Sequence, residues 1–162
     1  MKPADLLQLL TEFYRDKASL RQRHAAAARL VQNYDFNNTY QYVINREDIQ
    51  IQWVESAIAD MGGKTEPVAE PALTPQGKGE QAQTAVIRED RDGMQAFVDR
   101  WRDRVEKMTN ARHRNMLRVI LGETLEHKRF FEQMLSGRQD LLGRSADGAR
   151  TAGAVISTRW VE

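Results

Sequence analysis

Three side chains that could bind a metal ion lie close together in the segment LGETLEHKRFFEQM, residues 121–134. They are Glu123, Glu126 and His127. The apolar residues around them recur at helical spacing, so the carboxylates and the imidazole fall on or beside a face that should be buried. A buried carboxylate is costly unless a cation or hydrogen-bond donors neutralise it. The segment therefore predicts a polar site inside a helical core, held either by a metal ion or by basic side chains.

A second polar intrusion lies in the segment REDIQIQW, residues 46–53. The helical stripe through positions 40, 44, 47, 51, 54, 58 and 61 reads Tyr, Ile, Glu, Ile, Val, Ile and Met. Glu47 is the only charged residue on this stripe, and Gln50 lies about one turn away. The Glu47 carboxylate therefore needs a partner from a neighbouring helix.

Basic residues also lie on or beside the inward stripes. In the first stripe, positions 6, 10, 13, 17, 20, 24, 27 and 31, the polar residues are Lys17 and His24. His113 lies on the same stripe as His127, and Arg104 lies beside the stripe of the preceding helix. Because His24 and His113 lie away from the middle of their helices, we expect them to be hydrogen-bonded core or rim histidines rather than metal ligands.

Positioning these residues requires four helices, which the periodicity predicts at about 3–33, 38–61, 92–109 and 112–136. The turn and N-cap residues NYDFNN at 33–38 separate the first two helices. MGG at 61–63 ends the second, because glycine accepts the left-handed backbone of a helix C-cap. The turn near 109–112 is weakly marked, so one helix from 92 to 136 is the competing prediction. All 162 residues are assigned to a single domain.

Residues 62–90 contain three of the four prolines and are predicted to form a linker. A helix of ~25 residues is ~37 Å long, and ~12 extended residues cross that distance, so the linker can pass from one end of a bundle to the other. The C-terminal tail, 137–162, is rich in small residues but carries Val155, Ile156, Trp160 and Val161. We expect these apolar residues to pack along the bundle or across a subunit contact.

Composition narrows the classes of function. The absence of cysteine excludes thiolate zinc sites, iron–sulfur clusters and disulfides. With 24 Lys and Arg against 23 Asp and Glu, no basic excess indicates a nucleic-acid partner. No apolar run approaches the ~18 residues that a membrane span needs, so we expect no membrane partner and a cytoplasmic location. The sequence contains no motif for nucleotide binding or nucleophilic catalysis, so it does not identify a reaction.

Two helical hairpins joined by a long crossing, with REDIQIQW on one helix and ETLEHKRFF on another, resemble the ferritin-like superfamily, in its branch of small rubrerythrin-like bacterial proteins. The resemblance covers residues 3 to 136. It implies an all-α, ferritin-like four-helix bundle made of two antiparallel hairpins and a long crossover. It also implies iron or manganese carboxylate chemistry, with a metal site at Glu47, Glu123, Glu126 and His127.

The motifs of this chain depart from the family pattern. Glu47 matches the glutamate of the second-helix motif, but the position of its histidine partner is Gln50. His127 matches the histidine of the fourth helix, but the residue three positions before it is Thr124. The first helix carries Lys17 where the family has a glutamate, and Arg104 lies near the same level on the third helix.

Three interpretations of Glu47, Glu123, Glu126 and His127 follow. In the first, the layer is free of metal, and Lys17, Arg104 and Gln50 neutralise it. In the second, an altered site still binds iron or manganese. In the third, Glu47 or Glu126 lies on a solvated face. The first fits a structural or interaction protein, such as a homodimer or the binder of an unidentified protein partner, and the second fits a redox or oxygen-handling protein.

Overall fold

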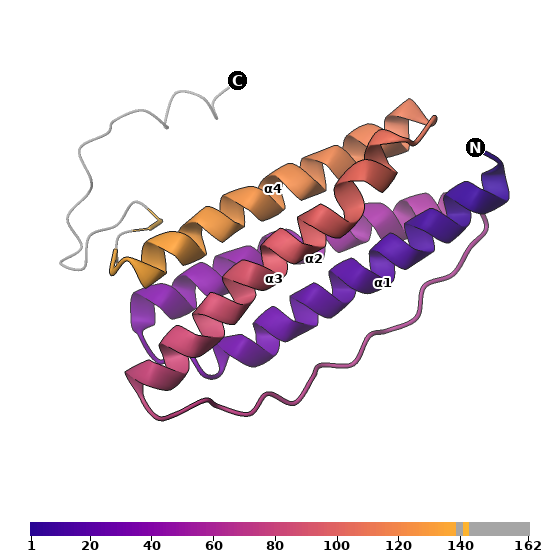
Figure 1. Cartoon of the computed structure of the whole chain (residues 1–162). Coiled ribbons are helices and arrows are strands. Elements are labelled where there is room, and N and C mark those ends of the chain that lie inside the picture. Colours follow the sequence, from indigo (N-terminus) through magenta and orange to yellow (C-terminus); the bar gives the residue numbers. More distant parts are fainter. Residues whose placement is uncertain (139–140, 143–162) are drawn as a thin grey trace, which may run out of the picture.

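The computed structural model describes residues 1–138, 141 and 142, and all the regular structure in this part of the chain is helical. Four helices form a bundle: α1 (Pro3–Ala28), α2 (Tyr34–Asp60), α3 (Glu80–Glu106) and α4 (Ala111–Leu135) (Figure 1). α1 packs against α2 and α3, and α4 packs against the same two helices. The prediction of an all-α four-helix bundle is therefore confirmed. Among the described residues, no helix has the long uncharged stretch needed to span a membrane.

Local capping explains where several helices begin and end. Asn33 and Asn110 each accept a hydrogen bond from a backbone N–H three residues later, at the starts of α2 and α4. After α2, Gly62 has φ +79°, and the N–H of Gly63 donates to the carbonyl of Ile58 at 2.9 Å. The predicted helix stop at MGG is confirmed.

Gly62→Ala is expected to destabilise the fold by about 1–2 kcal/mol, because an L side chain is strained at this positive φ. Gly93→Ala is the matched control, since a Cβ on this glycine in α3 meets nothing within 4 Å. That substitution should stabilise the protein by about 0.5–1 kcal/mol. Urea unfolding followed by circular dichroism measures both, and equal effects of the two substitutions would contradict the capping role of Gly62.

Three predicted helix boundaries are wrong by four residues or more, and one of them is the start of α2, at Tyr34 rather than near 38. α1 ends at Ala28 rather than near 33, and the amide of Asn37 donates to the carbonyls of Ala28 and Val31 beyond the helix end. α3 begins at Glu80 rather than near 92. Val86 and Ile87 are buried and fix its first turns to the core, although most residues around them are polar. A break at 107–110 separates α3 from α4, so the single helix from 92 to 136 is not observed.

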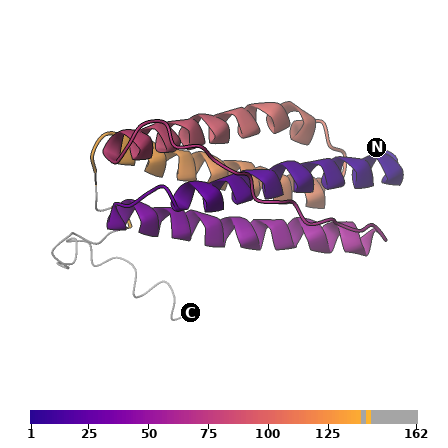
Figure 2. The same cartoon turned by 90° about the horizontal axis from the view of Figure 1, so that it is seen from below.

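The segment between α2 and α3, residues 61–79, runs along the outside of the bundle and crosses α1 (Figures 1 and 2). Tyr14 and Gln22 of α1 donate hydrogen bonds to the carbonyls of Glu66 and Val68, at 3.2 and 2.6 Å. These bonds hold the segment against α1. The predicted tail residues Val155, Ile156, Trp160 and Val161 lie outside the described residues.

The core consists of two apolar clusters, one centred on Phe13, Phe97 and Trp101 and the other containing Tyr40 and Phe131. Every residue of the predicted stripe on α1 is buried, including its two polar members. On α4 the stripe is wrong by about one residue, because Thr124 rather than Glu123 is fully buried. Polar residues occupy the boundary between the clusters on α2 and α4, at Glu47, Gln50, Thr124 and His127.

Candidate functional site

Glu47 of α2 is the centre of a buried polar layer. Its Oε2 lies 2.9 Å from the Nζ of Lys17, and its Oε1 lies 2.5 Å from the Nδ1 of His24. All three side chains are at most 1% exposed. Lys17 and His24 are seven residues apart on α1, so two successive helical turns direct both side chains to one carboxylate.

These two contacts determine the charge state of the carboxylate. Burial alone would raise the pKa of Glu47, but His24 and Lys17 lower that pKa from 4.5 to about 2. Lys17 also donates to the hydroxyl of Thr124 at 3.5 Å, and its ammonium lies 5.3 Å from the ring centre of Phe97. Glu47 is therefore an ionised carboxylate at neutral pH, with a cation of the protein at hydrogen-bond distance.

Glu123 of α4 is held by a second set of partners at the edge of the layer. Arg46 donates to its Oε1 at 2.6 Å, and the amide of Gln50 donates to its Oε2. Burial acts to raise the pKa of Glu123, but the hydrogen bonds from Gln50 and Arg46 leave that pKa below its usual value. Gln50 thus takes part in the layer as a donor to a carboxylate.

His127 lies in the layer without such a partner. Its side chain is buried between aromatic rings, with ring centres 6.1 Å from Tyr42 and 6.2 Å from Phe130. Burial lowers the pKa of His127 from 6.5 to about 4. Within the described residues no hydrogen bond joins His127 to Glu47 or Glu123. The imidazole is therefore neutral at pH 7.

The side chains of this layer do not fit an iron or manganese centre. A dinuclear carboxylate site needs about four carboxylates and two imidazoles directed at one point. In the described part of the chain, no three His, Asp or Glu residues are arranged to hold an ion. Both oxygens of Glu47 are already occupied, one of them by the ammonium of Lys17.

Comparisons with protein-family models, with curated proteins and with solved structures find no match for this chain. No relative therefore assigns a role to the polar layer.

Two predicted placements, those of Arg104 and Glu126, are corrected by the structure. Arg104 is not in the layer: it donates to Glu12 at 2.6 Å on the surface and lies 4.3 Å from the ring centre of Trp101. Glu126 is exposed, so it lies on a solvated face. His24 is a hydrogen-bonded core histidine, as expected, and its partner is Glu47. His113 is a partly buried rim residue, as expected.

Sequence reasoning missed a second buried carboxylate, Asp90 of α3. It accepts hydrogen bonds from the hydroxyl of Tyr40 and from Arg23, the latter at 2.9 Å. Burial raises the pKa of Asp90, and this effect outweighs the opposing effects of its partners. Asp90 precedes Met94 by four residues and Phe97 by seven, which is helical spacing and could have placed it on the buried stripe. It was missed because residues 62–90 were predicted to form a linker.

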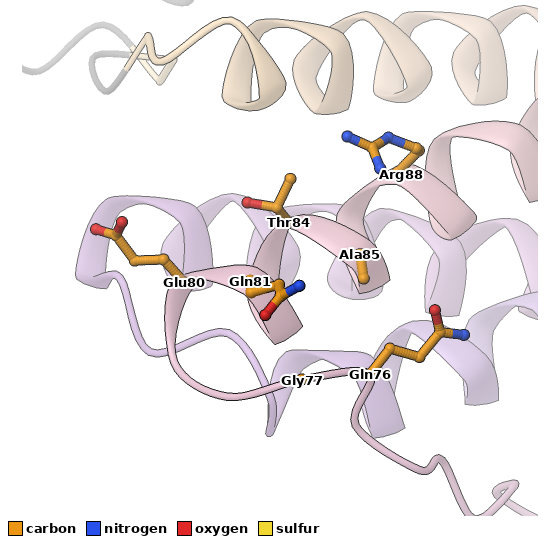
Figure 3. Close-up of a pocket in the computed structure, with 7 residues that line it drawn as sticks. All are labelled: Gln76, Gly77, Glu80, Gln81, Thr84, Ala85 and Arg88. Atoms are coloured by element: carbon orange, nitrogen blue, oxygen red, sulfur yellow. The ribbon is translucent and has the colours of Figure 1, made fainter.

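A surface pocket at the start of α3 is separate from this layer (Figure 3). The residues that line it are exposed except for Ala85, and none of them contacts Glu47 or its partners. They are Gln76, Gly77, Glu80, Gln81, Thr84, Ala85 and Arg88.

Proposed function

We propose that the protein is a ferritin-like bundle with a structural or interaction role. In this proposal the buried carboxylates are neutralised by cations of the protein and not by a metal ion. The observation that carries this proposal is the buried pair of Lys17 and Glu47, 2.9 Å apart. In a metal site the carboxylates would share the positive charge of the ion. Here the Lys17 ammonium supplies a positive charge at the carboxylate itself, so Glu47 is neutralised within the chain.

The charge balance of the rest of the layer supports the same proposal. Arg46 faces Glu123, and Arg23 faces Asp90 at the far side of the layer. Each of these carboxylates therefore has its own guanidinium partner. Adding a divalent ion would place extra positive charge beside cations that are already paired, which is unfavourable in a poorly solvated core.

The arrangement of the helices supports the ferritin-like topology in this proposal. Tyr42 of α2 contacts Phe130 of α4, and Arg46, one turn later on α2, pairs with Glu123, earlier on α4. Residue numbers thus rise on α2 as they fall on α4, as expected for antiparallel neighbours. The segment 61–79 runs along the outside of α1 for the length of the bundle and connects α2 to α3 (Figure 1), as the crossover does in a ferritin-like fold.

Elemental analysis tests the absence of metal. Protein expressed with added iron and manganese, and purified without chelator, is expected to contain far less than one metal ion per chain. Adding Fe²⁺ or Mn²⁺ should leave the Tm unchanged. Stoichiometric metal that is lost in Glu123→Ala or His127→Ala, and retained in the exposed control Glu126→Ala, would instead support a redox or oxygen-handling carboxylate protein.

A further inference from the structure

Several exposed apolar side chains lie on the side of the bundle formed by α2 and α4. Seven large apolar side chains are exposed among the described residues, and five of them lie on α2 and α4. Tyr34 is the first residue of α2, and the other four, further along the two helices, are Tyr42, Ile49, Trp53 and Val119. Met116 and Phe130 of α4 are partly buried on the same side. We refer to six of these residues as the α2–α4 face: Tyr42, Ile49, Trp53, Met116, Val119 and Phe130. Exposed apolar residues gathered on one surface indicate an interaction site more than scattered ones do.

Contacts between the two helices place these residues side by side. Tyr42 lies against Phe130, with ring centres 6.0 Å apart, and Arg46 pairs with Glu123. Ile49 follows Arg46 by one helical turn, and Val119 precedes Glu123 by one turn, so the two lie at the same level of antiparallel helices. The apolar residues therefore form a strip along α2 and α4, and the Arg46–Glu123 pair interrupts this strip.

The described chain leaves this strip uncovered. The segment 61–79 crosses α1, where its carbonyls accept hydrogen bonds from Tyr14 and Gln22, and then reaches α3 (Figure 2). α4 lies diagonally opposite α1, because it packs on α2 and α3. The crossing segment therefore passes on the other side of the bundle from the α2–α4 face.

We propose that the α2–α4 face binds the same face of a second copy of this chain. The two copies are related by a two-fold axis parallel to the helices, so that α2 of one copy lies on α4 of the other. This proposal deepens the interaction role proposed above and rests on it. An isologous contact of this kind closes on itself and gives a dimer.

Charge complementarity favours a second copy as the occupant. A two-fold axis parallel to the helices keeps each residue at its own level, so Arg46 meets Glu123 of the second copy. Both side chains are partly exposed, at 29% and 28%, and can each accept a further partner. The four charges then alternate in sign around the axis, while Tyr42 and Phe130 meet each other above them. Electrostatic complementarity of this kind sets the register of an interface.

The available area is also that of a stable dimer. A helix of ~25 residues is ~37 Å long, and two helices packed 8–10 Å apart present a face about 20 Å wide. The face thus offers about 700 Å² per copy, close to the ~800 Å² per partner of a standard interface.

Light scattering after gel filtration, in EDTA, tests the proposal with the full chain. The wild type is expected to be a dimer, and Val119→Glu a monomer with an unchanged helical spectrum, because Val119 is 51% exposed and its substitution leaves the core intact. The dimer Kd of this variant should rise by about a hundredfold, because the introduced carboxylate would lose its water in the interface without gaining a partner. Tyr34→Glu is the control, since Tyr34 is 77% exposed outside this face, and it should remain a dimer.

Mixing two charge-reversed variants tests the pairing itself. Arg46→Glu and Glu123→Arg should each weaken the dimer, because like charges would meet across the axis. An equimolar mixture should restore a dimer containing one copy of each. A mixture that stays monomeric while each variant remains folded would overturn the proposed register.

Other results would overturn the proposed dimer without affecting the metal-free core. They are a wild type that is monomeric at all concentrations, a Val119→Glu variant that remains a dimer, and a monomer that dimerises only after residues 143–162 are removed. The last result would make the tail the occupant of the face. Conversely, bound metal in a dimeric protein would overturn the metal-free function and leave the dimer standing.

Discussion

Lys17→Met should destabilise the folded protein by about 3–5 kcal/mol at pH 7, the cost of removing one partner of a buried ion pair. Methionine is long enough to fill most of the space of the lysine stem, so little of the loss comes from packing. The loss arises because Glu47, 1% exposed, keeps its charge and has only His24 as a close partner. Urea unfolding in EDTA measures the change.

The double variant Lys17→Met, Glu47→Met is the control for this prediction. Glu47→Met alone should cost a similar amount, since it leaves the Lys17 ammonium buried and unpaired. The double variant removes both charges and leaves His24 without its acceptor, which costs about 1–3 kcal/mol. It should therefore be more stable than either single variant. Strictly additive losses would mean that the two side chains do not interact.

Acidification should remove stability in two steps. The pKa of His127 is about 4 in the folded protein and 6.5 in the unfolded chain, so the unfolded chain takes up the proton first, and stability is lost as the pH falls from 6.5 to 4. The pKa of Glu47 is about 2 in the folded protein, against 4.5 unfolded, so its contribution is lost between pH 4.5 and 2. At 1.36 kcal/mol per pKa unit, each step is worth about 3 kcal/mol.

Variants assign each step to its residue. His127→Leu should abolish the loss of stability between pH 6.5 and 4, because leucine fills the apolar site and cannot be protonated. Glu47→Gln should flatten the profile below pH 4.5. The exposed Glu126→Gln should follow the wild-type profile throughout. Urea unfolding at each pH gives the profiles, and a His127→Leu variant with the wild-type slope would contradict a buried, neutral imidazole.

Much of the fold could be predicted because apolar periodicity reports burial directly. Every residue of the predicted stripes on α1 and α3 is buried, and the glycines after α2 end that helix as expected. The first turns of α3 were missed because Ala82, Val86 and Ile87 are too sparse among polar residues to outweigh the linker composition. Their burial depends on the rest of the bundle, which periodicity within one segment does not report.

The sequence predicted which residues belong to the candidate site, but it did not predict which of them contact one another. Lys17, Glu47 and His127 are buried, as their stripes indicated, and so is Gln50, which lies about one turn from Glu47. The rotation of α4 was wrong by one position, which exchanged Glu123 for Thr124 in the core. Pairings across helices depend on relative height and rotation, and a small error in either replaces one partner by another.

Arg104 and His24 illustrate that point. Arg104 lies beside the buried stripe of α3, but its long side chain reaches the surface and pairs with Glu12. His24 lies seven residues from Lys17 on α1, and both side chains meet the same carboxylate across the interface with α2. Distance from the middle of one helix was therefore a poor measure of distance from the site.

The most direct test of the central claim is a ¹³C NMR titration of the Glu47 carboxyl group in isotopically labelled protein. If Lys17 and His24 neutralise Glu47, its carboxyl carbon should keep the chemical shift of an ionised carboxylate down to about pH 3.5, well below its unfolded pKa of 4.5. One equivalent of Mn²⁺ should leave the signal sharp. Titration of Glu47 near pH 4.5, or broadening of its signal by Mn²⁺, would contradict a core neutralised by the protein's own cations.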